Sequence, residues 1–489
     1  MRVEIFKLVC LALTSVSFAP AQDRSLDSVI ANYSSSPALV HASWSVCARF
    51  VDTDSTICSF EPRKILAPAS CLKLVTTAAA LAVLGEEYRF QTTLTACGRI
   101  DSHHVLHGDL CIVGGGDPTL GSDLTPGSAD LDTLLATWVR AIKQAGIRRI
   151  AGRVLADDFA FDRIPIPDDW FWVDIGNYYA TSTSALTIND NLYRLYFHPG
   201  KKEGDAARLL RMEPRVTGLR FENHMKTGAE GSGDNGYIYC APGEWNAVLR
   251  GTVPAGPSEF DIKGSLPDPP LFAAQALRSA LRQARIPVQR GAIKLRSPRS
   301  YRDAKIILTT FSPPLKDVVT VINKRSFNLY AEQLLKTIGR ERKGEGSTDA
   351  GIEAVEGILD SLGVDLQGMQ LSDGCGLSRT NGISTWTLVS LLRAMKRTAH
   401  FDTYYHSLSL AGDSSDIGFF KSFGVGTEIQ NNARIKSGTI QGVRSYSGYI
   451  RDRQGRLIAF ALIANNFAGR SSRVDAIHRD IILQLARLP

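Results

Sequence analysis

The sequence predicts a multidomain α+β protein in which one domain, built from both ends of the chain, is interrupted by a long, mainly β insertion. The 489 residues are 44% hydrophobic and 21% charged, an ordinary globular composition, and their number suggests two to four domains at roughly 150 residues each. Strong helix and strand patterns occupy residues 27–84 and 327–488. Residues 89–307 instead hold short strands, many glycines and turn clusters, which favours two smaller inserted domains.

The N-terminus has the pattern of a secretory signal peptide. Arg2 and Lys7 give a basic start, residues 8–18 are mostly apolar but too short to span a bilayer, and Ala19-Pro20-Ala21 offers small residues at a cleavage site. We predict cleavage after Ala21 and an exported protein in the periplasm or extracytoplasmic envelope. A retained membrane anchor or a buried first helix is the alternative. No later segment is long and apolar enough to predict a transmembrane helix.

The charge of the chain gives little support to a nucleic-acid partner. The net charge of +7 is spread thinly, and its sharpest cluster, Arg148-Arg149 with Arg153, is typical of a solvated face. Export also argues against nucleic acid. The sign of the charge is compatible with an anionic cell envelope.

The cysteines are compatible with disulfides rather than with a metal site. Eight are present, of which Cys10 leaves with the signal peptide. Cys47 and Cys58 flank one predicted turn, and Cys97 and Cys111 flank another, so an oxidising compartment makes two bridges possible, each contributing roughly 2–4 kcal/mol. The pairing itself stays open. No Cys-x-x-Cys or His-Glu-x-x-His spacing occurs, and we predict no metal.

Start and stop signals place the elements around the insertion. Pro68 precedes and Gly85 follows an Ala- and Leu-rich stretch, as at the two ends of a helix. Before the insertion we predict a helix at 27–33, strands at 43–51 and 56–60, and a helix at 69–84. Within it, helical patterns are confined to 131–145 and 270–284. After it we predict helices at 327–338, 348–362, 385–397 and 474–488, and strands at 433–439, 443–450 and 457–464.

The last predicted helix has one apolar face, formed by Val474, Ile477, Ile481, Leu485 and Leu488. This face could lie on a membrane or cover an antiparallel sheet. We predict the sheet cover, because the polar face is not rich in lysine and arginine.

Ser70 and Lys73 form the only Ser-x-x-Lys in the chain and lie at the start of helix 69–84. Residues three apart share a helix face, with Cβ atoms about 5–6 Å apart, so Lys73 can reach the Ser70 hydroxyl. Serine needs a base to become a nucleophile, and burial or a neighbouring cation lowers the pKa of lysine toward that role. Free N–H groups at the helix start suit a developing oxyanion.

Ser326-Phe327-Asn328 is the only Ser-x-Asn and lies where a loop meets a helix. As a functional motif, it gives Ser326 a proton-relay role and Asn328 a hydrogen bond to a substrate amide. Taken alone, a helix cap would explain the triplet as well.

A third element has two candidates in the sequence. Lys436-Ser437-Gly438-Thr439 lies in a predicted strand followed by two more strands, which fits an edge position beside an attacked carbonyl. Lys226-Thr227-Gly228 leads instead into a glycine-rich stretch that we interpret as a loop. We therefore predict that residues 436–439 belong to the site.

These three motifs, in this order, resemble the signature of penicillin-binding proteins and serine β-lactamases. The long insertion narrows the resemblance to the low-molecular-mass class C penicillin-binding proteins, the D-alanyl-D-alanine carboxypeptidase/endopeptidase family. Further matching segments are Gly114 to Leu120, Asn189-Asp190-Asn191 and Asp373 to Arg379. The resemblance runs from about residue 27 to residue 488.

The resemblance implies a serine β-lactamase/D,D-peptidase-like catalytic domain, an antiparallel sheet covered by helices, with two nested, mainly β insert domains. The implied boundaries are a signal peptide at 1–21, the catalytic domain at 22–86 and 305–489, insert domain II at 87–185 and 255–304, and insert domain III at 186–254.

The resemblance also implies an acyl-enzyme route on peptidoglycan stem peptides, without metal or organic cofactor. Ser70 would attack the carbonyl between two D-alanines while Lys73 takes its proton, and Ser326 would help return that proton to the leaving amine. The N–H groups of Ser70 and Thr439 would form the oxyanion hole. The substrate carboxylate and peptide would be held by Lys436, Ser437, Thr439 and Asn328, and β-lactam antibiotics would act as inhibitors.

Three details depart from the family pattern or offer another chemistry. Ser437 replaces the commoner threonine and keeps a hydroxyl. Cys375 replaces the usual serine in the Asp-Gly-x-Gly loop, which leaves the chemistry of that loop open. Cys71 is next to Ser70, but neighbours on a helix point about 100° apart, so we predict a packed thiol rather than a nucleophile.

Other functions remain possible on the same residues. A β-lactamase or esterase would differ by fast deacylation, and a non-catalytic envelope scaffold would keep the fold alone. The sequence leaves open the balance of carboxypeptidase and endopeptidase activity, the diamino acid of the stem peptide and the oligomeric state.

Overall fold

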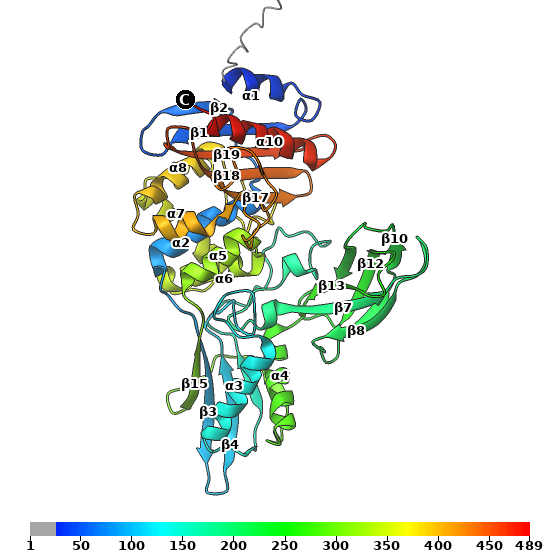
Figure 1. The fold of residues 1–489 in the computed structure, drawn as a ribbon. Coiled ribbons are helices and arrows are strands. Elements are labelled where there is room, and N and C mark those ends of the chain that lie inside the picture. Colours follow the sequence, from blue (N-terminus) through cyan, green and yellow to red (C-terminus); the bar gives the residue numbers. More distant parts are fainter. Residues whose placement is uncertain (1–25) are drawn as a thin grey trace, which may run out of the picture.

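A six-stranded antiparallel sheet combines strands from the first and last parts of the described chain (Figure 1). The computed structural model describes residues 26–489, and the predicted signal peptide lies outside them. The strand order is β16-β17-β18-β19-β1-β2. These strands are β16 (Ser409–Leu410), β17 (Arg434–Ile440), β18 (Val443–Arg451), β19 (Leu457–Asn465), β1 (Ser43–Phe50) and β2 (Thr56–Phe60).

Helices cover both faces of this sheet (Figure 1). One face is covered by α1 (Leu26–Ser34) and α10 (Ser471–Ala486). The other is covered by α2 (Lys73–Leu84), α5 (Leu315–Arg325), α6 (Asn328–Lys343), α7 (Thr348–Ser361), α8 (Thr385–Lys396) and α9 (Phe401–Ser407). The predicted fold class, a helix-covered antiparallel sheet with a β-rich insertion, is confirmed.

Strand β19 explains why two cores form. Its side chains alternate between the faces of the sheet, as in any strand, and every one of its residues is buried. Phe460 and Leu462 pack in the core beneath α10, whereas Ala461 and Ile463 pack in the core that contains α2 and α8. The interpretation of the last helix as a sheet cover is therefore confirmed. None of the helices in residues 26–489 is both long and apolar enough to cross a membrane.

The insertion between α2 and α5 contains the remaining sheets. One has the order β14-β6-β4-β3-β15, with β5 beside β4. Its parts are β3 (Gln91–Ile100), β4 (Val105–Val113), β5 (Arg149–Ile150), β6 (Val154–Asp157), β14 (Ala292–Lys294) and β15 (Lys305–Phe311), with helices α3 (Leu131–Gln144) and α4 (Pro269–Gln283). The others are β13-β7-β8 and β10-β12-β11 with β9, built from β7 (Leu192–His198), β8 (Arg208–Glu213), β9 (Arg220–Asn223), β10 (Lys226–Gly228), β11 (Asn235–Tyr239), β12 (Asn246–Pro254) and β13 (Phe260–Ser265).

Two strand pairings bear on the predicted domain boundaries. Strand β13 pairs with β7, although the boundary at residue 254 assigned it to the other insert domain. Strand β15 pairs with β3, although the boundary at residue 305 assigned it to the catalytic domain. We propose that the inner insert extends to residue 265 and the outer insert to residue 311, because a strand belongs to the sheet that supplies its hydrogen bonds.

The two possible disulfides have different outcomes. Cys47 lies opposite Ser59, and Cys58 lies opposite Ala48, so the two thiols point to opposite faces of the sheet. A bridge between Cys47 and Cys58 is therefore wrong, since a one-residue offset reverses the face. Cys97 and Cys111 share a face on β3 and β4, and their sulfur atoms are 2.9 Å apart as thiols.

Candidate active site

Ser70 and Lys73 lie on one helical segment between the sheet and its helical cover. Residues Ala69–Leu72 form a 3-10 turn, and α2 continues from Lys73. Lys73 is fully buried, and its Nζ donates to Ser70 Oγ over 3.0 Å, to Asn328 Oδ1 over 2.6 Å and to the Cys375 carbonyl over 2.7 Å. Burial lowers the pKa of Lys73, which favours the neutral amine that can accept a proton.

The turn that presents Ser70 is held by close backbone packing. Ala69 has a φ of +46°, in the left-handed region that few non-glycine residues adopt. Gly376 packs against it, and a Cβ at this position would lie only 1.9 Å from the Ala69 carbonyl oxygen. The loop that contains Gly376 therefore needs glycine there and fixes the approach to Ser70.

Ser326 and Asn328 lie at the junction of α5 and α6. Ser326 ends α5 with a left-handed φ of +57°, and Asn328 is the first residue of α6. The sharp turn directs Ser326 Oγ toward Lys436 Nζ, at 2.8 Å, and Asn328 Oδ1 toward Lys73. Asn328 Nδ2 donates to the carbonyl of Tyr179, over 2.7 Å, so the insertion also contacts this motif.

Strand β17 brings the third motif beside Ser70. Strand β16 pairs only with Arg434 and Ile435, so residues 436–440 have no strand partner on that edge within the described chain. A Cβ on Gly438 would lie 2.5 Å from the Pro68 carbonyl oxygen and 2.9 Å from the Ser70 nitrogen. Only glycine allows the strand to come this close to the nucleophile.

The rejected alternative, Lys226-Thr227-Gly228, lies in the insertion, in a different sheet from β17. The glycine-rich stretch after it, residues 229–234, is a loop as expected, whereas the triplet itself forms the short strand β10, paired with β12 in the insert. The local pattern of glycines did not reveal this pairing. None of the three residues lines the cavity described below.

Lys436 is the second buried cation of the site. Its Nζ donates to Ser326 Oγ and to the Ser437 carbonyl, both over 2.8 Å. Burial, together with the positive charge of Lys73, lowers the pKa of Lys436 to about 7. A group with this pKa can gain and lose a proton near neutral pH.

A cavity of about 1020 Å³ opens onto the three motifs. It is lined by Ser70, Ser326, Asn328, Ser437 and Thr439, whereas Lys73 and Lys436 are buried behind these residues. Its other walls come from the insertion, the loop after Cys375, strand β18 and helix α10. They include Asp174, Tyr179, Tyr237, Leu377, Arg379, Arg444, Asp475 and Arg479. The volume is in the range of sites that bind small molecules and peptide ends.

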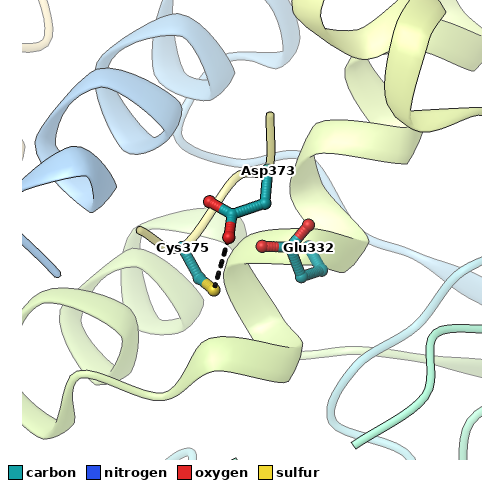
Figure 2. A group of neighbouring side chains, drawn as sticks. All are labelled: Glu332, Asp373 and Cys375. Carbon is teal, nitrogen blue, oxygen red and sulfur yellow. Dashed lines mark hydrogen bonds between the residues drawn. The ribbon is translucent and has the colours of Figure 1, made fainter. Parts of the chain in front are cut away.

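Glu332, Asp373 and Cys375 form a buried group (Figure 2). Their side-chain oxygen and sulfur atoms lie within 4.8 Å of one another. The Cys375 carbonyl links this group to Lys73. Asp373 accepts hydrogen bonds from Trp170 Nε1, the nitrogens of Gly376 and Ser378, and Asn381 Nδ2, and Glu332 accepts one from the Gly374 nitrogen. A carboxylate has about four lone-pair positions, so Asp373 is already filled, and the group suits anchoring the loop better than holding a metal.

The structure brings the predicted residues of all three motifs around one cavity. Sequence reasoning singled out Cys375 but missed the role of its carbonyl, and it missed Tyr179; both residues act through backbone carbonyls, which leave no side-chain signature. It also missed Glu332, which follows Asn328 by four residues and so shares its helix face. That spacing is the signal that could have indicated it. The departure at Cys375 has little effect on Lys73, because any residue supplies that carbonyl.

Comparison with known proteins agrees with this geometry. The model of the D-Ala-D-Ala carboxypeptidase 3 (S13) family matches residues 25–487. A D-alanyl-D-alanine carboxypeptidase from Actinomadura sp. is 32% identical over 443 residues, covering 88% of this chain and 79% of the relative. The crystal structure of penicillin binding protein 4 from Haemophilus influenzae aligns with a TM-score of 0.82 at 20% identity, covering 94% of this chain and 99% of the other. The same protein complexed with a novel β-lactam aligns at 0.77 and 19% identity, with the same coverage.

The match to the family model spans almost the whole described chain, and a relative above 30% identity covers most of it. The fold agrees independently, through the helix-covered sheet and its insertion. This protein therefore belongs to the D-Ala-D-Ala carboxypeptidase 3 (S13) family of serine-type peptidases.

Proposed function

We propose that this protein is a serine D,D-peptidase of peptidoglycan stem peptides. As a carboxypeptidase it cleaves the D-Ala-D-Ala bond, and as an endopeptidase the D-Ala-diamino-acid bond. The observation that carries the proposal is the buried Lys73 amine 3.0 Å from Ser70 Oγ, at a cavity edged by β17. The activity named for the Actinomadura relative supports the substrate class.

Acylation begins with Lys73 as a neutral amine. It then keeps two of its three hydrogen bonds as a donor and accepts the third from the Ser70 hydroxyl. Ser70 Oγ bonds to the carbonyl carbon of the penultimate D-alanine. The backbone N–H groups of Ser70 and Thr439 donate hydrogen bonds to the oxyanion that develops.

Collapse of that intermediate breaks the peptide bond and needs a proton for the leaving amine. Ser326 Oγ accepts a hydrogen bond from Lys436 and faces the cavity, so it can relay a proton to the amine. Water then attacks the ester, giving its proton through Ser326 to the now neutral Lys436, and Lys73 returns its proton to Ser70 Oγ as the shortened peptide leaves. A β-lactam acylates Ser70 in the same way, but its leaving group stays attached and slows the attack of water.

The place of action is the extracytoplasmic envelope, where the substrate is found. The basic and apolar N-terminal pattern supports export, and the Haemophilus relative is named a penicillin binding protein. The expected partners are stem peptides and β-lactams.

Intact mass after incubation with a penicillin tests the proposal, with Ser70→Ala in parallel. We expect one stable adduct on the parent and none on the variant, followed by release of D-alanine from a stem pentapeptide by the parent. An unmodified parent with intact penicillin would support a non-catalytic scaffold instead. Rapid loss of penicillin without an accumulating adduct would support a β-lactamase.

A further inference from the structure

Arg444 lies on β18 directly across from Thr439, at the β17 end of the cavity. The strand register pairs these two residues, and Arg444 Nη1 donates a hydrogen bond to Thr439 Oγ1. Arg444 Nη2 donates to Tyr446 Oη over 3.0 Å, and Nε donates to the Asp475 carboxylate. These three contacts hold the guanidinium in place, with its Nη1 nitrogen beside the Thr439 hydroxyl.

Lys436 is poorly suited to neutralise a substrate carboxylate at this end. Its Nζ is buried and already donates to Ser326 Oγ and the Ser437 carbonyl. Its pKa of about 7 also leaves a large part of the lysine neutral near neutral pH. A guanidinium stays protonated and has five N–H donors in one plane. Three of those of Arg444 are used by Thr439, Tyr446 and Asp475, so two remain for a carboxylate.

The balance of charge at this wall of the cavity is positive. Asp475 on α10 offsets part of the Arg444 charge, and the two are ion-paired. Arg479 lies four residues further along the same helix and also lines the cavity. Two guanidinium groups and one carboxylate give this wall a net positive charge, which attracts an anionic peptide end.

We propose that Arg444, together with Thr439, binds the free α-carboxylate of the residue released from the substrate and so determines specificity for it. This inference rests on the proposed function and adds a residue outside the three motifs. It predicts preference for peptides whose leaving residue carries a free carboxylate over the same peptides ending in a carboxamide. The covalent steps at Ser70 are unchanged.

Binding measured by calorimetry in the Ser70→Ala background tests this without turnover. The probes are a stem peptide ending in D-Ala-D-Ala as the free acid and the same peptide as the carboxamide. Adding Arg444→Gln is expected to raise the Kd of the acid about tenfold or more, as for loss of a charge-assisted hydrogen bond, and to change the Kd of the amide less than about twofold. Arg444→Lys, which keeps the charge, should restore part of the affinity.

Arg451→Gln is the matched control, because Arg451 is an exposed arginine at the far end of β18. It should bind both peptides as the Ser70→Ala parent does. Equal loss of affinity for acid and amide in Arg444→Gln, or no loss for the acid, would overturn the inference. Because the measurement needs no catalysis, absence of acylation in the wild type would count against the proposed function alone.

Discussion

Lys73 and Lys436 place two amine groups in one buried, hydrogen-bonded site, and their surroundings give them different tasks. Lys73 contacts the Ser70 hydroxyl directly, whereas Lys436 contacts Ser326. The positive charge of Lys73 contributes to the lowered pKa of Lys436. Protonation of one lysine therefore disfavours protonation of the other, which suits a proton that moves between the two sides of the reaction.

Replacing the base gives the first prediction at the scale of single residues. Lys73→Met keeps an apolar stem of similar length but removes the group that accepts the Ser70 proton. We expect the rate constant for acylation by penicillin, followed by intact mass, to fall about 10²- to 10⁴-fold. Lys64→Met, at an exposed position before the motif, should acylate as the wild type does. Acylation of Lys73→Met at the wild-type rate would exclude Lys73 as the base.

Glu332 gives a prediction for stability against pH. Burial, with the negative charge of Asp373, raises the pKa of Glu332 to about 7. Between the ordinary glutamate pKa and about 7, the folded state therefore binds more protons than the unfolded state, and the free energy of unfolding falls as pH rises through that window. The full effect is at most roughly 3 kcal/mol.

Glu332→Gln has the same shape and stays neutral, so it removes this dependence. The Tm of Glu332→Gln minus that of the wild type should therefore be larger at about pH 8 than at about pH 5. Both proteins keep the neighbouring groups Lys73, Asp373 and Cys375, so these do not cause the difference. Thermal unfolding at the two pH values checks this. Parallel changes of Tm in the two proteins would contradict the raised pKa of Glu332.

At the residue scale, what the sequence predicts follows from side-chain chemistry. The spacing of Ser70 and Lys73 on a helix predicts their contact, and the structure has it. The carbonyls of Tyr179 and Cys375 could not be predicted, because every residue has a carbonyl and only the fold selects which one faces an amine.

At the scale of elements, the distance between β17 and the turn of Ser70 is set by a glycine. Gly438→Ala would place a methyl group within 2.5 Å of the Pro68 carbonyl and push the strand away from Ser70. We expect acylation by penicillin to slow about 100-fold or more, since a displacement of about 1 Å at a reacting centre has that effect. The measurement is again intact mass against time.

Gly357→Ala is the control for that substitution. Gly357 is exposed within α7, and a Cβ there would meet nothing within 4 Å. It should acylate normally and raise the free energy of unfolding by about 0.5–1 kcal/mol, because alanine is the better helix former. Normal acylation by Gly438→Ala would show that the strand position tolerates the methyl group.

The hairpin of β3 and β4 carries the prediction about disulfides. With sulfur atoms 2.9 Å apart on one face, Cys97 and Cys111 should form a bridge on exposure to a small-molecule disulfide, whose own bond is reduced to two thiols. Free thiols are then titrated in denaturant. The oxidised wild type should have one free thiol fewer than fully reduced Cys97→Ser, because the bridge removes two thiols and the substitution removes one. Reaction of all seven cysteines of residues 26–489 in the oxidised protein would contradict the bridge.

Local elements were predictable where local signals exist. Most helices and strands outside the insertion begin within about two residues of their predicted positions, although the helix predicted at 327–338 runs to Lys343. Helices α5 and α9 were missed. The pairing of β1 with β19, and of β15 with β3, joins segments hundreds of residues apart, and no local pattern encodes such register.

At the scale of the whole molecule, the insertion is part of the site. The inserted residues begin after α2, which carries Lys73, and end before α5, which is followed by Ser326. The Tyr179 carbonyl of the insertion holds Asn328, and Tyr237 on β11 lines the same cavity as Ser70. We expect a small β-lactam to contact mainly the motif residues, and a longer stem peptide to contact Tyr237 as well.

Tyr237→Ala should therefore separate the two kinds of substrate. Tyr237 is partly exposed, so its truncation leaves the core intact, and loss of its apolar contact should lower kcat/KM for a stem pentapeptide about three- to tenfold. Acylation by penicillin should be unchanged. Phe311→Ala, which removes an exposed ring from β15 outside the cavity lining, should leave both activities as in the wild type. An equal fall in both activities of Tyr237→Ala would mean that the insertion supports the catalytic residues rather than the peptide.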